Sequence, residues 1–163
     1  MLTLQRLKEV LHYNRRTGLF TWNIKISKKV TVGSTAGTIS YFGYIQIGID
    51  KKLYLAHILA WFYVYGVWPT GEIDHKDTDK KNNRIKNLRD VTHANNLQNQ
   101  VRARTDNKST KLLGVTFDKY RGTYMAKICT DKKYKFLGRF ETPELAHAAY
   151  VKTKRKYHST CTI

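Results

Sequence analysis

The chain has 163 residues, of which 41% are hydrophobic, so it can bury one or two small cores and is not expected to be disordered. No apolar run approaches bilayer length, and the N-terminal segment lacks the basic-then-apolar order of a secretory signal, which argues against membrane insertion and export. The formal net charge of +18 indicates nucleic acid as the default partner, with ribosome association, an anionic membrane surface or simple solubility as alternatives.

Acidic residues are distributed unevenly along the chain. Residues 1–70 hold nine Lys or Arg against two Asp or Glu, residues 71–104 hold eight against five, and residues 105–163 hold thirteen against five. The middle segment therefore keeps the acids that a divalent cation site needs, while both flanks are basic.

The N-terminal region predicts a helix followed by strands. Residues 2–13 carry apolar side chains at helical spacing behind Thr3, a plausible N-cap, which predicts an amphipathic helix. Residues 19–22 predict a strand, and residues 44–49 predict another because their isoleucines alternate. Residues 50–52 then predict a hairpin turn into the next strand.

A buried helix is expected next. Residues 56–65 are nearly all apolar, and Gly66 and Pro69 follow them as stop signals. Residues 102–111 are rich in turn formers and charge, so we expect a linker there. The linker would separate two modules.

Beyond the linker the pattern predicts three strands and a helix. The strands are expected at residues 114–117, 123–128 and 133–140, and Thr142 with Pro143 marks the start of a helix. Because side chains alternate along a strand, the expected open face of this small sheet is basic. The residues expected to face DNA are Arg121, Lys127, Lys133, Lys135 and Arg139.

The stretch EIDHKDTDKKNNRIKNLRDVTHANNLQNQ, residues 72–100, predicts a strand, an Asn-rich loop, a second strand and a helix. We expect Asp74 from the first strand and Asn96 from the helix to meet around one hard cation, because Mg²⁺ favours oxygen ligands. His75 would accept a proton from water as a general base. The alternative is that the Asn and Asp residues only stabilise turns and caps in a hairpin that has no catalytic role.

Residues 73–100 resemble the HNH motif of phage and intron homing endonucleases, whose pattern is a DH pair, an NN, an NL and a closing His or Asn on a helix. The resemblance implies that Asp74 and Asn96 hold Mg²⁺ or Mn²⁺, that His75 is the general base, and that Asn87 braces the loop. Asn96 stands where the motif's closing His is usual.

Three further residues are accessory candidates. Asn83 is expected to help brace the loop, and Asn99 lies on the predicted helix with Asn96. His57 belongs to AHILAW, which resembles the AHRLAW segment that precedes the motif in this branch, with Ile58 where Arg is usual. Its role stays open between a contact to the phosphate and a hydrogen-bonded core position.

Residues 112–158 resemble an AP2-type DNA-binding domain, a three-stranded sheet lying on one helix. The signature residues are GV, an aromatic-x-A-x-I strand, LGxF and a Thr-capped, Ala-rich helix. Tyr124 stands where Trp is typical, and Lys127 stands where plant relatives carry an acid, so no base preference is transferred.

Together these patterns predict an α+β protein with a ββα-metal (HNH) nuclease core and an AP2-like module. The expected domains are residues 1–104 for the nuclease, with the motif at about 72–104, then a linker at 105–111 and a DNA-binding domain at 112–163. The expected function is a metal-dependent endonuclease on double-stranded DNA, monomeric and located in the cytoplasm, which for a phage protein is the host's. The alternatives are a non-catalytic DNA-binding regulator and an RNA-binding or ribosome-associated protein.

Overall fold

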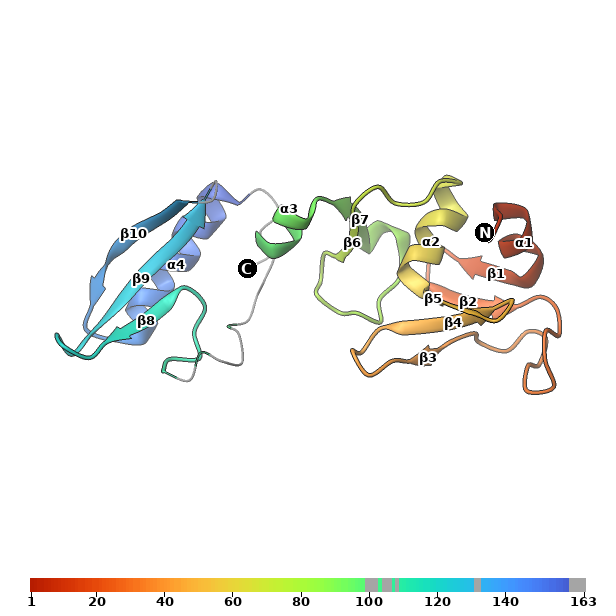
Figure 1. The fold of residues 1–163 in the computed structure, drawn as a ribbon, viewed down its shortest axis with the longest axis horizontal. Helices are drawn as coiled ribbons and strands as arrows, with labels where there is room; N and C mark the ends of the chain where they lie inside the picture. Colours follow the sequence, from red (N-terminus) through yellow and green to blue (C-terminus); the bar gives the residue numbers. More distant parts are fainter. Residues whose placement is uncertain (99–102, 104–106, 108, 131–132, 159–163) are drawn as a thin grey trace. The chain divides into compact units, whose positions relative to one another are not determined.

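The computed structural model describes the chain except for residues 99–102, 104–106, 108, 131–132 and 159–163. The chain divides into two compact units, Met1–His93 and Ala94–Ile163, and each has a hydrophobic core of its own (Figure 1). Helices alternate with small antiparallel sheets, which agrees with the mixed helix and sheet composition predicted from the sequence. No helix within the described ranges is long and apolar enough to cross a membrane.

The first unit begins with α1 (Leu4–Val10), and the hydroxyl of Thr3 caps this helix as predicted. The expectation that the helix continues to residue 13 is wrong, because Leu11–Asn14 forms strand β1 and pairs with β2 (Leu19–Trp22). Leu11 and Tyr13 alternate inward along β1 and become buried in the core. Pairing with β2 therefore outweighs the local helical pattern.

A three-stranded sheet follows, formed by β3 (Thr38–Ile39), β4 (Ile45–Ile49) and β5 (Lys52–Leu55) in that spatial order. The predicted hairpin turn is confirmed, since Asp50 and Lys51 adopt left-handed conformations with φ of 47° and 64°. Two successive residues at positive φ match the right-handed twist of the paired strands.

Helix α2 (Ala56–Tyr65) has the bounds expected from the sequence. It buries Leu59, Ala60 and Phe62 in the core of the first unit. Gly66 ends the helix in the left-handed region with φ of 74°, and its N–H donates to the carbonyl of Phe62 at 2.9 Å. The helix thereby carries His57 into the interior.

The polar stretch forms the predicted strand, loop, strand and helix. Strand β6 (Glu72–His75) pairs with β7 (Leu88–Val91), and a long loop with the short helix η1 (Ile85–Asn87) connects them. Helix α3 (His93–Gln98) comes next, and the chain passes from the first unit to the second after His93.

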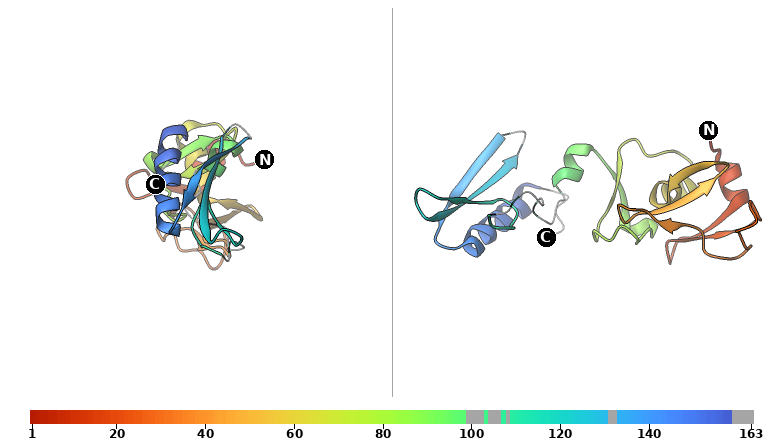
Figure 2. Two further views of the ribbon diagram at one scale, coloured as in Figure 1. Left: turned by 90° about the vertical axis from the view of Figure 1, so that its left-hand side faces the viewer. Right: turned by 60° about the horizontal axis from the view of Figure 1, so that its bottom comes forward.

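The second unit is a sheet of β8 (Val115–Asp118), β9 (Thr123–Thr130) and β10 (Lys133–Phe140), in the order β10-β9-β8, with α4 (Pro143–Tyr157) against one face (Figure 2). The cap predicted at Thr142 is confirmed, because its hydroxyl accepts from the N–H of Leu145 at 3.3 Å. Much of the expected linker lies outside the described residues.

A β-bulge in β10 changes which side chains share a face. The register steps from Phe136 opposite Lys127 to Gly138 opposite Ala126, so Leu137 is the extra residue. Leu137 packs against the core of the second unit. Strict alternation therefore fails along this strand.

Candidate active site

Asp74 lies in the middle of the β6–β7 hairpin and is held by an arginine on the facing strand. The register pairs Asp74 with Arg89, and the Oδ2 of Asp74 accepts from Nε and Nη2 of Arg89 at 2.8 and 2.7 Å. Both side chains are largely shielded from solvent, which strengthens the charge-assisted contact. Sequence reasoning did not select Arg89, although the antiparallel register of the predicted hairpin would have placed it opposite Asp74.

His75 is buried, and its Nε2 lies 3.1 Å from the Oδ1 of Asn83. Its ring also lies among two aromatic neighbours, with centroid distances of 6.1 Å to Tyr44 and 5.0 Å to His57. Strand β6 thus presents Asp74 and His75 on opposite faces, as alternation requires. Tyr44 was not a sequence candidate, and nothing in its local pattern marks it out from other strand aromatics.

His57 reaches the same place from the first turn of α2. Burial, together with the neighbouring His75, lowers the pKa of His57 to about 4, so this imidazole is neutral at ordinary pH. Among the described residues its Nδ1 has no hydrogen-bond partner. The structure therefore brings the accessory candidate His57 next to the proposed general base.

The loop between β6 and β7 is organised by Asn87. Its Nδ2 donates to the Oδ1 of Asp77 at 2.9 Å and to the carbonyl of Asn82 at 2.8 Å, while its Oδ1 accepts from the N–H of Asp77 at 3.2 Å. Burial would raise the pKa of Asp77, but hydrogen bonds from Asn82, Asn87 and the N–H of Asp79 outweigh it and lower that pKa. The side chain of Asn87 thus connects two parts of the loop, at Asp77 and at Asn82.

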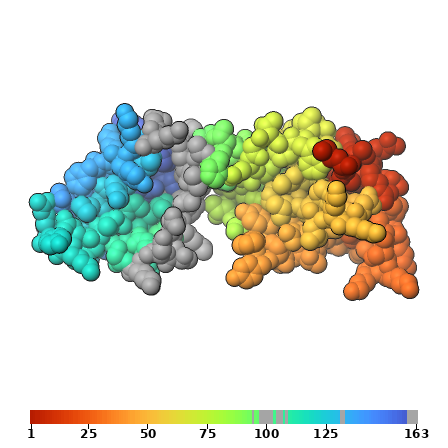
Figure 3. Space-filling model, in the orientation of Figure 1, coloured from red at the N-terminus to blue at the C-terminus, as the bar shows by residue number. Residues whose placement is uncertain are grey.

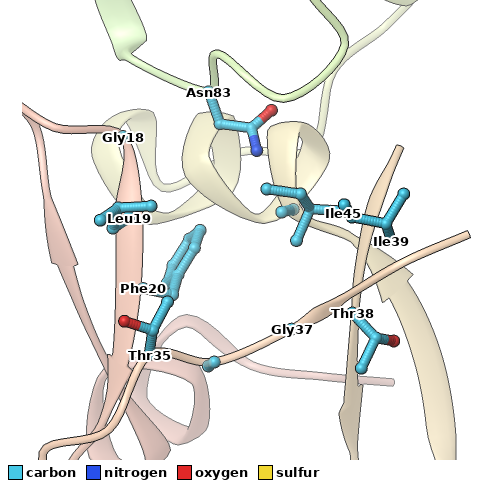
Figure 4. A pocket seen from close by; sticks show the side chains of 11 residues that line it. Gly18, Leu19, Phe20, Thr35, Gly37, Thr38, Ile39, Ile45 and Asn83 are labelled. Carbon is cyan, nitrogen blue, oxygen red and sulfur yellow. The ribbon is translucent and has the colours of Figure 1, made fainter. Parts of the chain in front are cut away.

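Asn83 is held from both sides. Its carbonyl accepts from the hydroxyl of Tyr13 at 2.6 Å, and its amide oxygen faces His75. Its Nδ2 is buried without a partner among the described atoms and points toward a cavity of about 90 Å³ between Phe20 and Ile45 (Figure 4). A cavity of this size has room for ordered water.

The remaining candidates of the motif lie at its end. Asn96 is on α3 in the second unit, and Asn99 lies outside the described residues. His93, at the start of α3, pairs through Nδ1 with the Oε1 of Glu72 at 2.6 Å. Across the described ranges no three His, Cys, Asp or Glu side chains gather as a metal cluster. The carboxylate and amide oxygens of Asp74 and Asn96 are nevertheless the donor types that a hard divalent cation takes.

Residues 54–98 match the family model of the HNH endonucleases. The matched segment runs from β5 to α3 and contains the hairpin, its loop and His57. It supports a nuclease that hydrolyses phosphodiester bonds in DNA, and HNH nucleases generally use a divalent metal. Comparisons with curated proteins and with solved structures return no match for the chain.

The sheet face opposite α4 in the second unit carries fewer of the expected cations than the sequence predicts. Lys127 and Arg139 lie on this open face, where Lys127 is 5.5 Å from the ring centroid of Tyr134 and Arg139 is 5.3 Å from that of Phe136. Arg121 is exposed in the turn between β8 and β9.

The face predicted for Lys135 is wrong. Its Nζ donates to the hydroxyl of Tyr157 on α4 at 3.2 Å, and the register pairs it with the buried Ile128. Lys133 precedes Lys135 by two residues on the same strand, so it lies on the same face as Lys135. The bulge at Leu137 explains the error, because it places Arg139 and Lys135 on opposite faces although both numbers are odd.

Proposed function

We propose that the protein is a divalent-metal-dependent, homing-type HNH endonuclease that cuts double-stranded DNA. The observation that carries this proposal is the β6–β7 hairpin, with His75 fixed against Asn83 and Asp74 fixed against Arg89, inside a segment that matches the HNH endonucleases. The expected domain bounds, 1–104 and 112–163 with a linker between them, belong to this proposal, as do a monomeric state and the cytoplasm of a phage host.

His75 is the proposed general base. Because the Oδ1 of Asn83 accepts hydrogen bonds, the Nε2 of His75 carries the proton in this arrangement, and Nδ1 is the nitrogen that removes a proton from the attacking water. His57 stays neutral beside it and adds no competing charge. Its proposed part is to pack against the base and hold its ring in place.

Asp74 and Asn96 are the proposed ligands of Mg²⁺ or Mn²⁺. The bound cation would stabilise charge on the scissile phosphate and on the departing oxygen. The contact from Arg89 fixes the position of the Asp74 carboxylate. Asn87 keeps the loop in place through Asp77, and Asn83 orients the base.

The second unit is proposed to position the nuclease on DNA as an AP2-like module. Lys127 and Arg139 share one sheet face with Tyr134 and Phe136, and Arg121 extends the basic edge. A twisted sheet of three strands with cations on its open face suits the major groove of a duplex. Lys133 and Lys135 are proposed at its margin, where they can reach phosphates.

The test is conversion of supercoiled plasmid to nicked or linear DNA. We expect cleavage with Mg²⁺, no cleavage with EDTA, and a loss of about 10²–10⁴-fold in the rate for His75→Ala, the range for removal of a general base. His12→Ala, at an exposed histidine of β1, is the matched control and keeps full activity. Plasmid binding by gel shift is measured for each variant. An intact, metal-independent binder that leaves plasmid uncut contradicts the proposal and favours a non-catalytic DNA-binding regulator.

A further inference from the structure

The turn that connects β3 and β4 carries two aromatic side chains at its tip, and both face solvent. Tyr41 is 98% exposed and Phe42 is 71% exposed, and their rings lie edge to face with centroids 5.3 Å apart. The segment that carries them forms part of the surface of the first unit (Figure 3). Adjacent exposed rings at a hairpin tip leave apolar surface in water, which indicates a contact surface rather than a packing role.

Backbone hydrogen bonds fix the shape of this tip. The N–H of Gly43 donates to the carbonyl of Ser40 at 2.9 Å, and the N–H of Ser40 donates to the carbonyl of Tyr44 at 2.8 Å. Gly43 has φ of +82°, a conformation that side chains rarely adopt. The two rings are therefore presented on a closed turn, so little backbone freedom is lost when they bind.

The tip is also joined to the loop that follows the proposed catalytic strand. The Nζ of Lys80 donates to the carbonyl of Phe42 at 3.1 Å and lies 4.7 Å from the ring centroid of Tyr44. Tyr44 in turn packs against His57 and approaches His75. One turn thus directs Tyr44 inward to the histidine pair and directs Tyr41 and Phe42 outward.

The charges around the tip suit a nucleic acid. Lys80 and Lys81 are exposed on the adjoining loop, while the carboxylates of Asp77 and Asp79 accept hydrogen bonds within that loop. Cations attract phosphates, and flat exposed rings beside them offer stacking surfaces for bases. A protein partner would use the rings without needing the neighbouring lysines.

We propose that Tyr41 and Phe42 form a nucleobase-stacking wedge, which enters duplex DNA beside the phosphate presented to His75. This proposal rests on the proposed nuclease function. Aromatic and apolar wedges open a base step and bend the duplex, and the cost of unstacking is offset by the additional contacts that the bend permits. Here the wedge would distort the DNA at the place where His75 needs access to the backbone.

The experiment measures affinity of the full chain for two short duplexes that differ by one abasic site, in EDTA so that hydrolysis plays no part. A wedge binds the abasic duplex more tightly, because the gap removes the cost of unstacking. We expect Phe42→Ala combined with Tyr41→Ala to lose about tenfold in affinity for the abasic duplex, the scale of one stacked base. Phe42→Trp keeps the preference because indole stacks as well as benzene.

The matched control is Leu53→Ala, which removes an apolar side chain that is also 71% exposed, on β5 of the same sheet. It leaves the abasic preference unchanged. Equal affinity of the unmodified chain for both duplexes, or an equal loss for both in the aromatic variant, overturns the wedge. Plasmid cleavage with Mg²⁺ is recorded separately, so cutting without abasic preference refutes the wedge alone, and abasic preference without cutting refutes the nuclease alone.

Discussion

The imidazoles of His57 and His75 lie edge to face with ring centroids 5.0 Å apart, and both are buried. One comes from the first turn of α2 and the other from the end of β6, so a helix and a strand meet at this pair. Burial, with the neighbouring His75 as a smaller cause, lowers the pKa of His57, because a charge on this ring is disfavoured in the interior. Protonation of His57 is thereby linked to the folding of the first unit.

The first prediction concerns stability at acid pH. The pKa of His57 falls from 6.5 to about 4 on folding, so between these values the unfolded chain binds a proton that the folded chain does not. Above about pH 6.5 His57 takes nothing from the free energy of unfolding. As the pH falls from there to about 4, this free energy decreases by about 3 kcal/mol in total. Urea unfolding across this range should show a shallower pH dependence for His57→Gln than for the unmodified chain.

An exposed histidine provides the comparison for that measurement. His12→Gln on β1 should leave the pH dependence of the free energy of unfolding unchanged. If the free energy of unfolding depends on pH in the same way for the unmodified chain and for His57→Gln, His57 is not the group whose protonation opposes folding.

The second prediction concerns the loop brace. Asn87→Ala removes two hydrogen bonds, one to the exposed carboxylate of Asp77 and one to the carbonyl of the half-buried Asn82. We expect a loss of about 1–3 kcal/mol in the free energy of unfolding. Asn87→Asp should be worse at neutral pH than at acid pH, because it sets a second carboxylate beside Asp77. Chemical denaturation at both pH values measures this, and an unchanged midpoint for both variants would contradict the brace.

The third prediction concerns the close approach of Gly18 to the backbone of the β6–β7 loop. A Cβ at Gly18 would lie 2.4 Å from the backbone N of Arg84 and 2.7 Å from the carbonyl carbon of Asn83, whereas a Cβ at Gly33 would meet nothing within 4 Å. Both glycines have positive φ, of +77° and +82°, so Gly33→Ala reports the backbone strain alone. Gly18→Ala should cost about 1–3 kcal/mol more than Gly33→Ala in thermal or urea unfolding, and equal costs would refute the close approach.

The fourth prediction concerns the basic face of the second unit. Lys127→Ala and Arg139→Ala should each weaken binding to duplex DNA and reduce the slope of log affinity against log salt by about one. Lys152→Ala is the matched control, because Lys152 is an exposed lysine on α4 and should leave the slope nearly unchanged. Fluorescence titrations at several salt concentrations measure the slopes. A larger effect at Lys152 than at Arg139 would place the DNA surface elsewhere.

Local sequence signals were sufficient for much of the fold. The apolar run before Gly66 predicted α2 with its observed bounds, and the Thr142-Pro143 pair predicted the start of α4. The alternating isoleucines predicted β4 because one face of that strand is buried. These signals act within a few residues, where the sequence pattern and the final structure agree.

Nonlocal contacts decided the rest. The helix predicted through residue 13 gave way to β1 because Tyr13 finds its place in the core and donates to the carbonyl of Asn83, seventy residues away. The bulge at Leu137 moved Lys135 away from Arg139, and its one local signal, Gly138 inside the strand with φ of +139°, was not used in the strand prediction. At the candidate site, Asp74 and His75 could be selected from their motif, whereas Tyr44 is brought to them by tertiary packing.

The bond between the hydroxyl of Tyr13 and the loop at Asn83 bears on how short a folded fragment that carries the motif can be made. Arg84 also donates from Nε to the carbonyl of Arg16 at 2.8 Å, so β1 and the β1–β2 turn support the loop between β6 and β7. A peptide comprising the matched segment alone, residues 54–98, would lack these anchors and should not hold the loop in its folded conformation. Grafting the motif into another host would accordingly require transplanting its amino-terminal platform as well.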